Sequence, residues 1–310
     1  MPIKVPDNLP AQATLEDDGV LLITERAAVR QDVRPLEIAL LNLMPEKIKT
    51  ETQISRLLGA TPLQIELSLL TTSSYAPKNT SAEHMLAFYQ PWEDVRDRKF
   101  DGLIVTGAPI ETLPFQDVVY WRELTQIFDW SQSHVQETYN ICWGGQAALH
   151  HFHGVPKHEL PEKKFGVFPH HVRGGRDGLL RGFNDVIPVP VSRHTEMRRE
   201  DLPEQAGLVV LLESDESGLC LVRDEARRQT YMFNHLEYDT ETLADEYHRD
   251  VAAGAEIQKP AYYFPEDDPG QPPINSWRAH GALLICNWIY DLYQSTSFEL
   301  ANIPERRQAG

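Results

Sequence analysis

Short apolar runs alternate with longer segments of helical periodicity through the first half of this chain. The runs are PLEIALLNLM (35–44), LQIELSLLTT (63–72), DGLIVTGAP (101–109) and ETYNIC (137–142). Because parallel strands must be joined by a crossover, usually a helix, this alternation predicts βαβ units and a doubly wound α/β fold with a parallel sheet. Pro45 and Ser81 each stand just before an expected crossover helix, where proline and serine favour a helix start.

The second half of the chain has a different pattern. After Gly154 the expected strands are shorter and richer in Pro, Gly and His, which favours hairpins over crossovers. They lie at 165–172, 186–192, 207–214 and 228–235, and two further helices are expected at 240–254 and 276–294. Since no repeat or clear linker separates the halves, we expect one domain over 1–310, with a short N-terminal extension (1–34) and a flexible C-terminal tail (299–310).

The composition limits the partners that this protein can have. A formal net charge of −17 argues against a nucleic-acid partner, because binding phosphates needs a surplus of Lys and Arg on one face. No apolar run is long enough to cross a membrane, and the N-terminus lacks the charged start and apolar centre of a signal peptide. Three scattered cysteines do not make a disulfide framework or a metal site. We therefore expect a cytoplasmic protein with free thiols.

One cysteine stands apart from the other two. Cys220 and Cys286 lie inside apolar runs, where cysteine behaves as a small hydrophobe, whereas Cys142 ends a run and is followed at once by Trp-Gly-Gly and an alanine-rich helical pattern. A strand that turns sharply into a helix exposes its corner residue, and nearby glycines make that corner possible. The helix N-terminus would favour the reactive thiolate. Cys142 is thus a candidate nucleophile, and the alternative is a buried cysteine that merely ends a strand.

A cysteine nucleophile needs a base, and His235 is the best placed of twelve histidines. It ends the run TYMFNHLEYD and is followed two residues later by Glu237. Residues i and i+2 of an extended chain share a face, so this carboxylate can orient the imidazole and stabilise its protonated form. The alternative is an edge-strand histidine beside an ordinary acid. For the other candidates, solvated or packing roles are expected: His150, His151, His153, His170 and His171.

Together, Cys142 at a nucleophile elbow and the His235–Glu237 pair resemble the triad of the class I glutamine amidotransferase-like fold, a flavodoxin-like doubly wound sheet. Within that fold, the chain is most similar to the homoserine O-acyltransferases of the MetA type. The resemblance runs from about Met1 to Tyr293. The blocks that carry it are ALLNLMPEKIKTE, FDGLIVTGAP, CWGGQAALHHFHGVPK, HLEYDTETLADEYHRDV and SWRAHGALL.

This resemblance implies a ping-pong acyl transfer in methionine biosynthesis. Cys142 would take the acyl group from acyl-CoA as a thioester, which the hydroxyl of L-homoserine then attacks. His235 would be the general base and Glu237 its orienting carboxylate. The backbone N–H of Trp143, with another from the 107–110 loop, would form the oxyanion hole. The resemblance also implies a homodimer that needs no metal and no cofactor beyond the co-substrate acetyl-CoA.

The resemblance further places substrate-binding roles on Lys163, Ser192 and Arg249, and the choice of acyl group on Glu111. In family members that use succinyl-CoA, a glycine at the position of Glu111 leaves space beside the thioester. A carboxylate at this position therefore implies homoserine O-acetyltransferase. Three alternatives stay open at this point. They are a succinyltransferase, a glutamine amidohydrolase with the same Cys-His-Glu arrangement, and a catalytically silent sensor on this fold.

Overall fold

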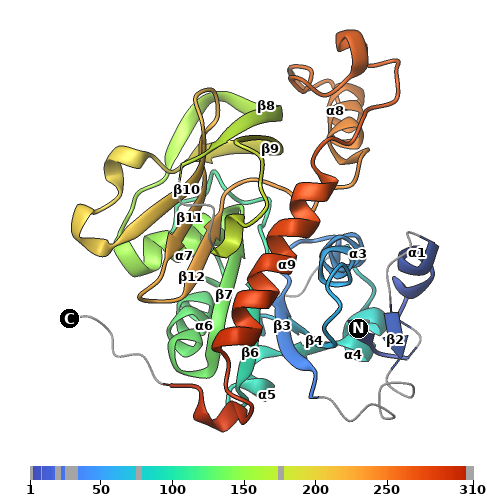
Figure 1. Ribbon diagram of the computed structural model, residues 1–310. Helices are drawn as coiled ribbons and strands as arrows, with labels where there is room; N and C mark the ends of the chain where they lie inside the picture. The colour runs from blue at the N-terminus through green and yellow to red at the C-terminus, as the bar shows by residue number, and fades with distance from the viewer. Residues whose placement is uncertain are drawn as a thin grey trace.

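The computed structural model describes residues 3–7, 9–17, 22–24, 34–74, 79–173 and 178–304, and within them one mixed sheet of twelve strands runs through the molecule (Figure 1). Its strand order is β2-β1-β4-β3-β6-β7-β12-β11-β10-β8-β9, with β5 beside β4. The strands are β1 (Ile3–Val5), β2 (Leu22–Thr24), β3 (Leu36–Leu41), β4 (Ile65–Thr71), β5 (Tyr89–Pro91), β6 (Phe100–Val105), β7 (Val135–Ile141), β8 (His158–Val172), β9 (Val186–Glu196), β10 (Leu208–Ser214), β11 (Gly218–Asp224) and β12 (Gln229–Met232).

The sheet changes character at β12. From β2 to β12 every neighbouring pair is parallel, whereas β11, β10, β8 and β9 continue the sheet as antiparallel strands. Strand β12 therefore pairs in parallel with β7 on one side and antiparallel with β11 on the other. This confirms the expected contrast between crossovers in the first half of the chain and hairpins in the second.

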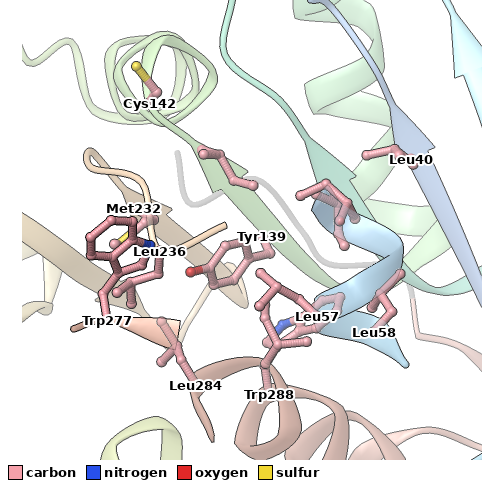
Figure 2. Packing of buried hydrophobic residues seen from close by; sticks show 14 of the residues in the cluster. Leu40, Leu57, Leu58, Tyr139, Cys142, Met232, Leu236, Trp277, Leu284 and Trp288 are labelled. Atoms are coloured by element: carbon pink, nitrogen blue, oxygen red, sulfur yellow. The ribbon is translucent and has the colours of Figure 1, made fainter. Parts of the chain in front are cut away.

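Helices cover both faces of the parallel part. The helices are α1 (Gln12–Asp17), α3 (Lys47–Leu58), α4 (Ala82–Phe88), α5 (Trp92–Val95), α6 (Trp121–His134), α7 (Trp143–His153), α8 (Thr242–Ala252) and α9 (Arg278–Ser295). Of these, α8 lies away from the parallel strands (Figure 1) and contacts β8 and β9. Helices α3 and α9 contribute to one apolar core (Figure 2), and α6 and α7 contribute to another on the opposite side of the strands (Figure 1). Helix α9 approaches β6 so closely that a Cβ on Gly102 would lie 2.8 Å from the ring of Trp288. The doubly wound architecture predicted from the sequence is confirmed.

Local signals in the sequence placed several helix ends correctly. The Ser81 hydroxyl accepts a hydrogen bond from the backbone N–H of His84 at 3.2 Å, which makes it the N-cap of α4. Helix α3 begins two residues after Pro45, and α8 and α9 fill the two helical segments expected in the second half.

The two ends of the chain contribute ordered structure. Residues 1–34, expected as an extension, supply β1 and β2 to the edge of the sheet, with β1 in register beside β4. In the expected tail, 299–310, Leu300–Asn302 form a 3-10 turn and Ile303 is buried, while residues 305–310 lie outside the described part of the chain. In the described residues, no helix is both long and apolar enough to cross a membrane.

Candidate active site

Cys142 occupies a sharp corner between β7 and α7. Its backbone has φ 51° and ψ −120°, a conformation that costs roughly 1–3 kcal/mol for a residue with a side chain. Its N–H donates to the carbonyl of Met232 at 2.6 Å, which ties the corner to the end of β12. Figure 2 shows Cys142 at the near end of α7, with its sulfur directed away from the apolar core that surrounds Tyr139. The predicted elbow is present, and strain at this residue is typical of a functional position.

Glycines let the backbone pack closely around this corner. A Cβ on Gly144 would lie 2.5 Å from the carbonyl oxygen of Thr106, so α7 approaches the end of β6 only because this residue has no side chain. A Cβ on Gly107 would lie 3.6 Å from both Sγ of Cys142 and the backbone nitrogen of Trp143. The loop after β6 therefore borders the thiol and the first amide of α7, where the oxyanion hole was expected.

His235 lies beside Cys142 and Glu237. Its Nδ1 hydrogen-bonds Oε1 of Glu237 at 2.6 Å, and its side chain also hydrogen-bonds that of Cys142. Its ring stacks on Tyr238, with centroids 4.0 Å apart and planes inclined by 13°. Burial acts to lower the pKa of His235, but the charges and hydrogen bonds of Cys142 and Glu237 outweigh it and raise this pKa well above the usual value. The contacts with Cys142 and Glu237 thus favour the protonated form of the imidazole.

The local backbone at His235 differs from the prediction. Strand β12 ends at Met232, so the strand expected over 228–235 was placed three residues too far at its end, and Glu237 lies in a turn. The backbone leaves the sheet because Asn234 is held from both sides: its Oδ1 accepts from Nε of the buried Arg193 at 3.3 Å, and its Nδ2 donates to Nε2 of His170 at 2.9 Å. The predicted contact between His235 and Glu237 survives in this geometry.

The sequence analysis did not identify buried Arg193, which hydrogen-bonds Asn234, the residue before His235. Arg193 is 2% exposed and also donates to the carbonyls of Thr195 and Ser217. Burial lowers the pKa of His170 to about 4, which keeps its ring neutral and able to accept from Asn234. The expected packing role of His170 is confirmed. Arg193 directly follows the strand expected at 186–192, and nothing in the sequence indicated that its guanidinium group would be buried.

Glu111 follows β6 at the same edge of the sheet. The backbone N–H of His194 donates to its carboxylate, while Oε2 is buried without a hydrogen-bond partner among the described residues. Burial raises the pKa of Glu111, opposed by that hydrogen bond and by the charges of His194, His235 and Arg193. Glu111 thus interacts electrostatically with His235, and its role in the choice of acyl group stays a prediction. Burial therefore favours the neutral form of this carboxyl group over the ionised one.

The three predicted substrate-binding residues meet at a fourth residue, Glu246 of α8. Lys163 of β8 donates to its Oε1 at 2.5 Å, Ser192 of β9 donates to Oε1 and Oε2 at 3.0 and 2.9 Å, and Nη2 of Arg249 lies 3.9 Å from Oε1. The sequence argument missed Glu246. Its position three residues before Arg249 on one helix face was the available signal, because residues i and i+3 are neighbours on a helix.

Three of the remaining histidine candidates hydrogen-bond elsewhere. His151 pairs with Asp129 and His153 with Asp224, each at 2.8 Å, and His150 contacts the carbonyl of Val155 at 3.0 Å. In the part of the chain that the structure describes, no three His, Cys, Asp or Glu side chains come together in a way that could hold a metal ion.

Comparisons with known proteins show which family this chain belongs to. A family model described as homoserine O-succinyltransferase matches residues 2–298. A protein named homoserine O-acetyltransferase from Allorhizobium ampelinum is 56% identical over 307 residues, covering 99% of each chain. A protein of the same name from Novosphingobium aromaticivorans is 58% identical over 303 residues, covering 98% of this chain and 99% of its own.

Solved structures show the same fold at low sequence identity. A glutamine amido transferase from Methylobacillus flagellatus has a TM-score of 0.53 and 15% identity, covering 86% of this chain and 99% of that one. A glutamine amidotransferase from Thermotoga maritima has a TM-score of 0.54 and 12% identity, covering 85% and 100%. The predicted class I glutamine amidotransferase-like fold is confirmed.

Proposed function

Because the chain belongs to the homoserine O-succinyltransferase family, we propose that it transfers an acetyl group from acetyl-CoA to the hydroxyl of L-homoserine in methionine biosynthesis. The observation that carries the proposal is the contact of His235 with both Cys142 and Glu237 at a strained strand-to-helix corner. A nucleophile, a base and a carboxylate that orients the base are the parts that acyl transfer through a covalent intermediate requires.

The first half-reaction moves the acetyl group to the enzyme. The thiolate of Cys142 attacks the thioester carbonyl of acetyl-CoA, and the oxyanion that forms lies near the N–H of Trp143 and the loop that begins at Gly107. When the bond from the carbonyl carbon to the CoA sulfur breaks, protonated His235 gives its proton to the leaving thiolate. The raised pKa of His235 supports this role, because the imidazole then carries the proton before acetyl-CoA binds.

The second half-reaction moves the acetyl group to homoserine. Neutral His235 removes the proton of the hydroxyl as its oxygen attacks the acetyl thioester, and the thiolate of Cys142 is expelled. Cys142 is then free of the acetyl group, and His235 again carries the proton. We place homoserine between β8, β9 and α8, with the Glu246 carboxylate facing its ammonium group and Arg249 its carboxylate, while Lys163 and Ser192 hold Glu246.

The preference for acetyl over succinyl is assigned to Glu111. The curated relatives above are named homoserine O-acetyltransferase, whereas the family model carries the name of the succinyl enzyme. The side chain of Glu111, in the loop that borders Cys142, occupies space where the succinyl group would extend, and when ionised it would also repel the succinyl carboxylate. Acetyl-CoA meets neither obstacle.

We further propose that the enzyme is a cytoplasmic homodimer that needs no metal or cofactor besides acetyl-CoA. The free thiols of Cys142, Cys220 and Cys286 suit a reducing compartment. The dimer rests on the family resemblance.

The decisive experiment is intact-protein mass spectrometry with acetyl-CoA and no homoserine. The protein should gain the mass of one acetyl group, located on Cys142, and lose it when homoserine is added. Cys142→Ala should gain nothing, while the matched control Cys286→Ala should behave as wild type. An unlabelled wild-type protein that hydrolyses glutamine would instead indicate an amidohydrolase, and one that does neither would indicate a sensor.

A further inference from the structure

Lys157 hydrogen-bonds the backbone of the loop that carries Glu111. It lies in the short segment between α7 and β8, and its Nζ donates to the carbonyl oxygens of both Glu111 and Leu113. The same ammonium group stands 4.6 Å from the centroid of the Phe115 ring. A cation held by two carbonyls and an aromatic face fixes the position of the backbone that it contacts.

The other contacts of this loop divide into two kinds. Internal hydrogen bonds give the loop its shape: Ile110 N–H donates to Ala108 at 2.8 Å and Leu113 N–H to Ile110 at 3.0 Å. Contacts to other elements set the position of the loop. They include the hydrogen bonds from Lys157 to the carbonyls of Glu111 and Leu113, and the hydrogen bond from the His194 N–H to the Glu111 carboxylate. Removing Lys157 would therefore leave the loop folded but free to shift.

The direction of that shift follows from the environment of one carboxylate oxygen of Glu111. Oε2 of Glu111 is buried and has no hydrogen-bond partner among the described residues. A buried carboxylate oxygen without a partner is costly, and movement toward solvent would relieve the cost. Movement of the loop away from Lys157 would break the hydrogen bonds from this lysine to the carbonyls of Glu111 and Leu113, so Lys157 opposes it.

We propose that Lys157 is a specificity-determining residue, which maintains discrimination between acyl groups by clamping the Glu111 loop against the site. Lys157 acts through Glu111 as a positioning residue and does not itself touch the acyl group. The inference rests on the proposed function, since it assumes that Glu111 faces the acyl group.

The test compares the ratio of kcat/KM for acetyl-CoA to that for succinyl-CoA. In Lys157→Met the ratio should fall about tenfold, because the loop and its carboxylate can retreat from a longer acyl chain. Lys99→Met is the matched control: Lys99 Nζ also donates to two backbone carbonyls, of Ala301 at 3.1 Å and Ile303 at 2.8 Å, but it precedes β6 at the opposite edge of the sheet. Its ratio should equal that of wild type.

A double variant separates a loop clamp from general loosening. If Lys157 acts only through Glu111, Lys157→Met should leave the ratio unchanged when added to Glu111→Gly. Lys157→Arg, which keeps the charge and can still donate to the carbonyls, should restore most of the ratio. Should Lys157→Met not fold, as judged by circular dichroism, Lys157→Gln decides with the same expected direction.

The outcomes distinguish the two proposals. A wild-type ratio in Lys157→Met or its substitute, or an equal fall in the Glu111→Gly background, overturns the clamp and leaves the proposed function standing. A wild-type enzyme that transfers no acetyl group to homoserine refutes the proposed function, and the clamp with it.

Discussion

Replacing Glu111 with glycine should convert an acetyl-selective enzyme into one that also accepts succinyl-CoA. If an ionised Glu111 lay about 4 Å from the succinyl carboxylate, repulsion at an effective dielectric of about 20 would be about 4 kcal/mol. That energy corresponds to roughly a thousandfold in kcat/KM. Acetyl carries no such charge, so Glu111→Gly should raise succinyl-CoA use relative to acetyl-CoA by up to this factor.

The structure adds a pH dependence to this prediction. Burial raises the pKa of Glu111, while the hydrogen bond from the backbone N–H of His194 and the electrostatic interactions with His194, His235 and Arg193 oppose that rise. The neutral carboxyl is favoured at low pH, where only the bulk of the side chain excludes succinyl. Discrimination should therefore grow as pH increases through the raised pKa, and Glu111→Gln, which keeps the bulk without the charge, should lack this dependence.

The assay is the ratio of the two kcat/KM values for wild type, Glu111→Gln and Glu111→Gly, measured at several pH values with homoserine saturating. The two variants separate the effect of charge from that of bulk. Glu111→Gln removes only the charge, whereas Glu111→Gly removes the charge and the bulk. The reasoning is refuted if wild type prefers succinyl-CoA, or if Glu111→Gly leaves the ratio unchanged.

Three further predictions concern the base, the substrate pocket and stability. His235→Asn should reduce acylation of the enzyme by about 10² to 10⁴, and Glu237→Gln should reduce kcat while acetyl-CoA still binds; wild-type rates in either, measured well below saturation, would contradict the assigned roles. Glu246→Gln should raise KM for homoserine while leaving acetylation of the enzyme by acetyl-CoA unchanged, and equal losses in both half-reactions would show a structural role instead. His170 has a pKa of about 4 in the folded protein against about 6.5 when unfolded, so its contribution of about 3 kcal/mol is complete above pH 6.5 and lost as pH falls through 4. Urea titrations at pH 7 and 4.5 should show a smaller stability loss in His170→Gln than in wild type.

The parts of the fold that depend on neighbours in sequence were predicted well. Strand and helix periodicities, the cap at Ser81 and the corner at Cys142 are local signals, because each depends on a few consecutive residues. The contact of His235 with Glu237 was also predictable, since only one residue separates them.

The parts that depend on distant segments were not predictable from one sequence. Strand β1 pairs with β4 across some sixty residues of chain, and no short pattern encodes that pairing. Glu246 of α8 hydrogen-bonds Lys163 of β8 and Ser192 of β9. Its role is therefore visible only when these three elements are brought together in the fold. The early end of β12 has the same origin, because Asn234 is held by Arg193 and His170.

The mixed sheet explains how one histidine can serve both half-reactions. Cys142 and the loop of Glu111 belong to the parallel part of the sheet, which would receive the acyl donor. Lys163 and Ser192 belong to the antiparallel part, which would receive homoserine. His235 follows β12, the strand that is parallel to β7 and antiparallel to β11, and so it stands where the two parts join. A base at this junction can give its proton to the CoA thiolate on one side and take one from the homoserine hydroxyl on the other, without a change in the fold between the two steps.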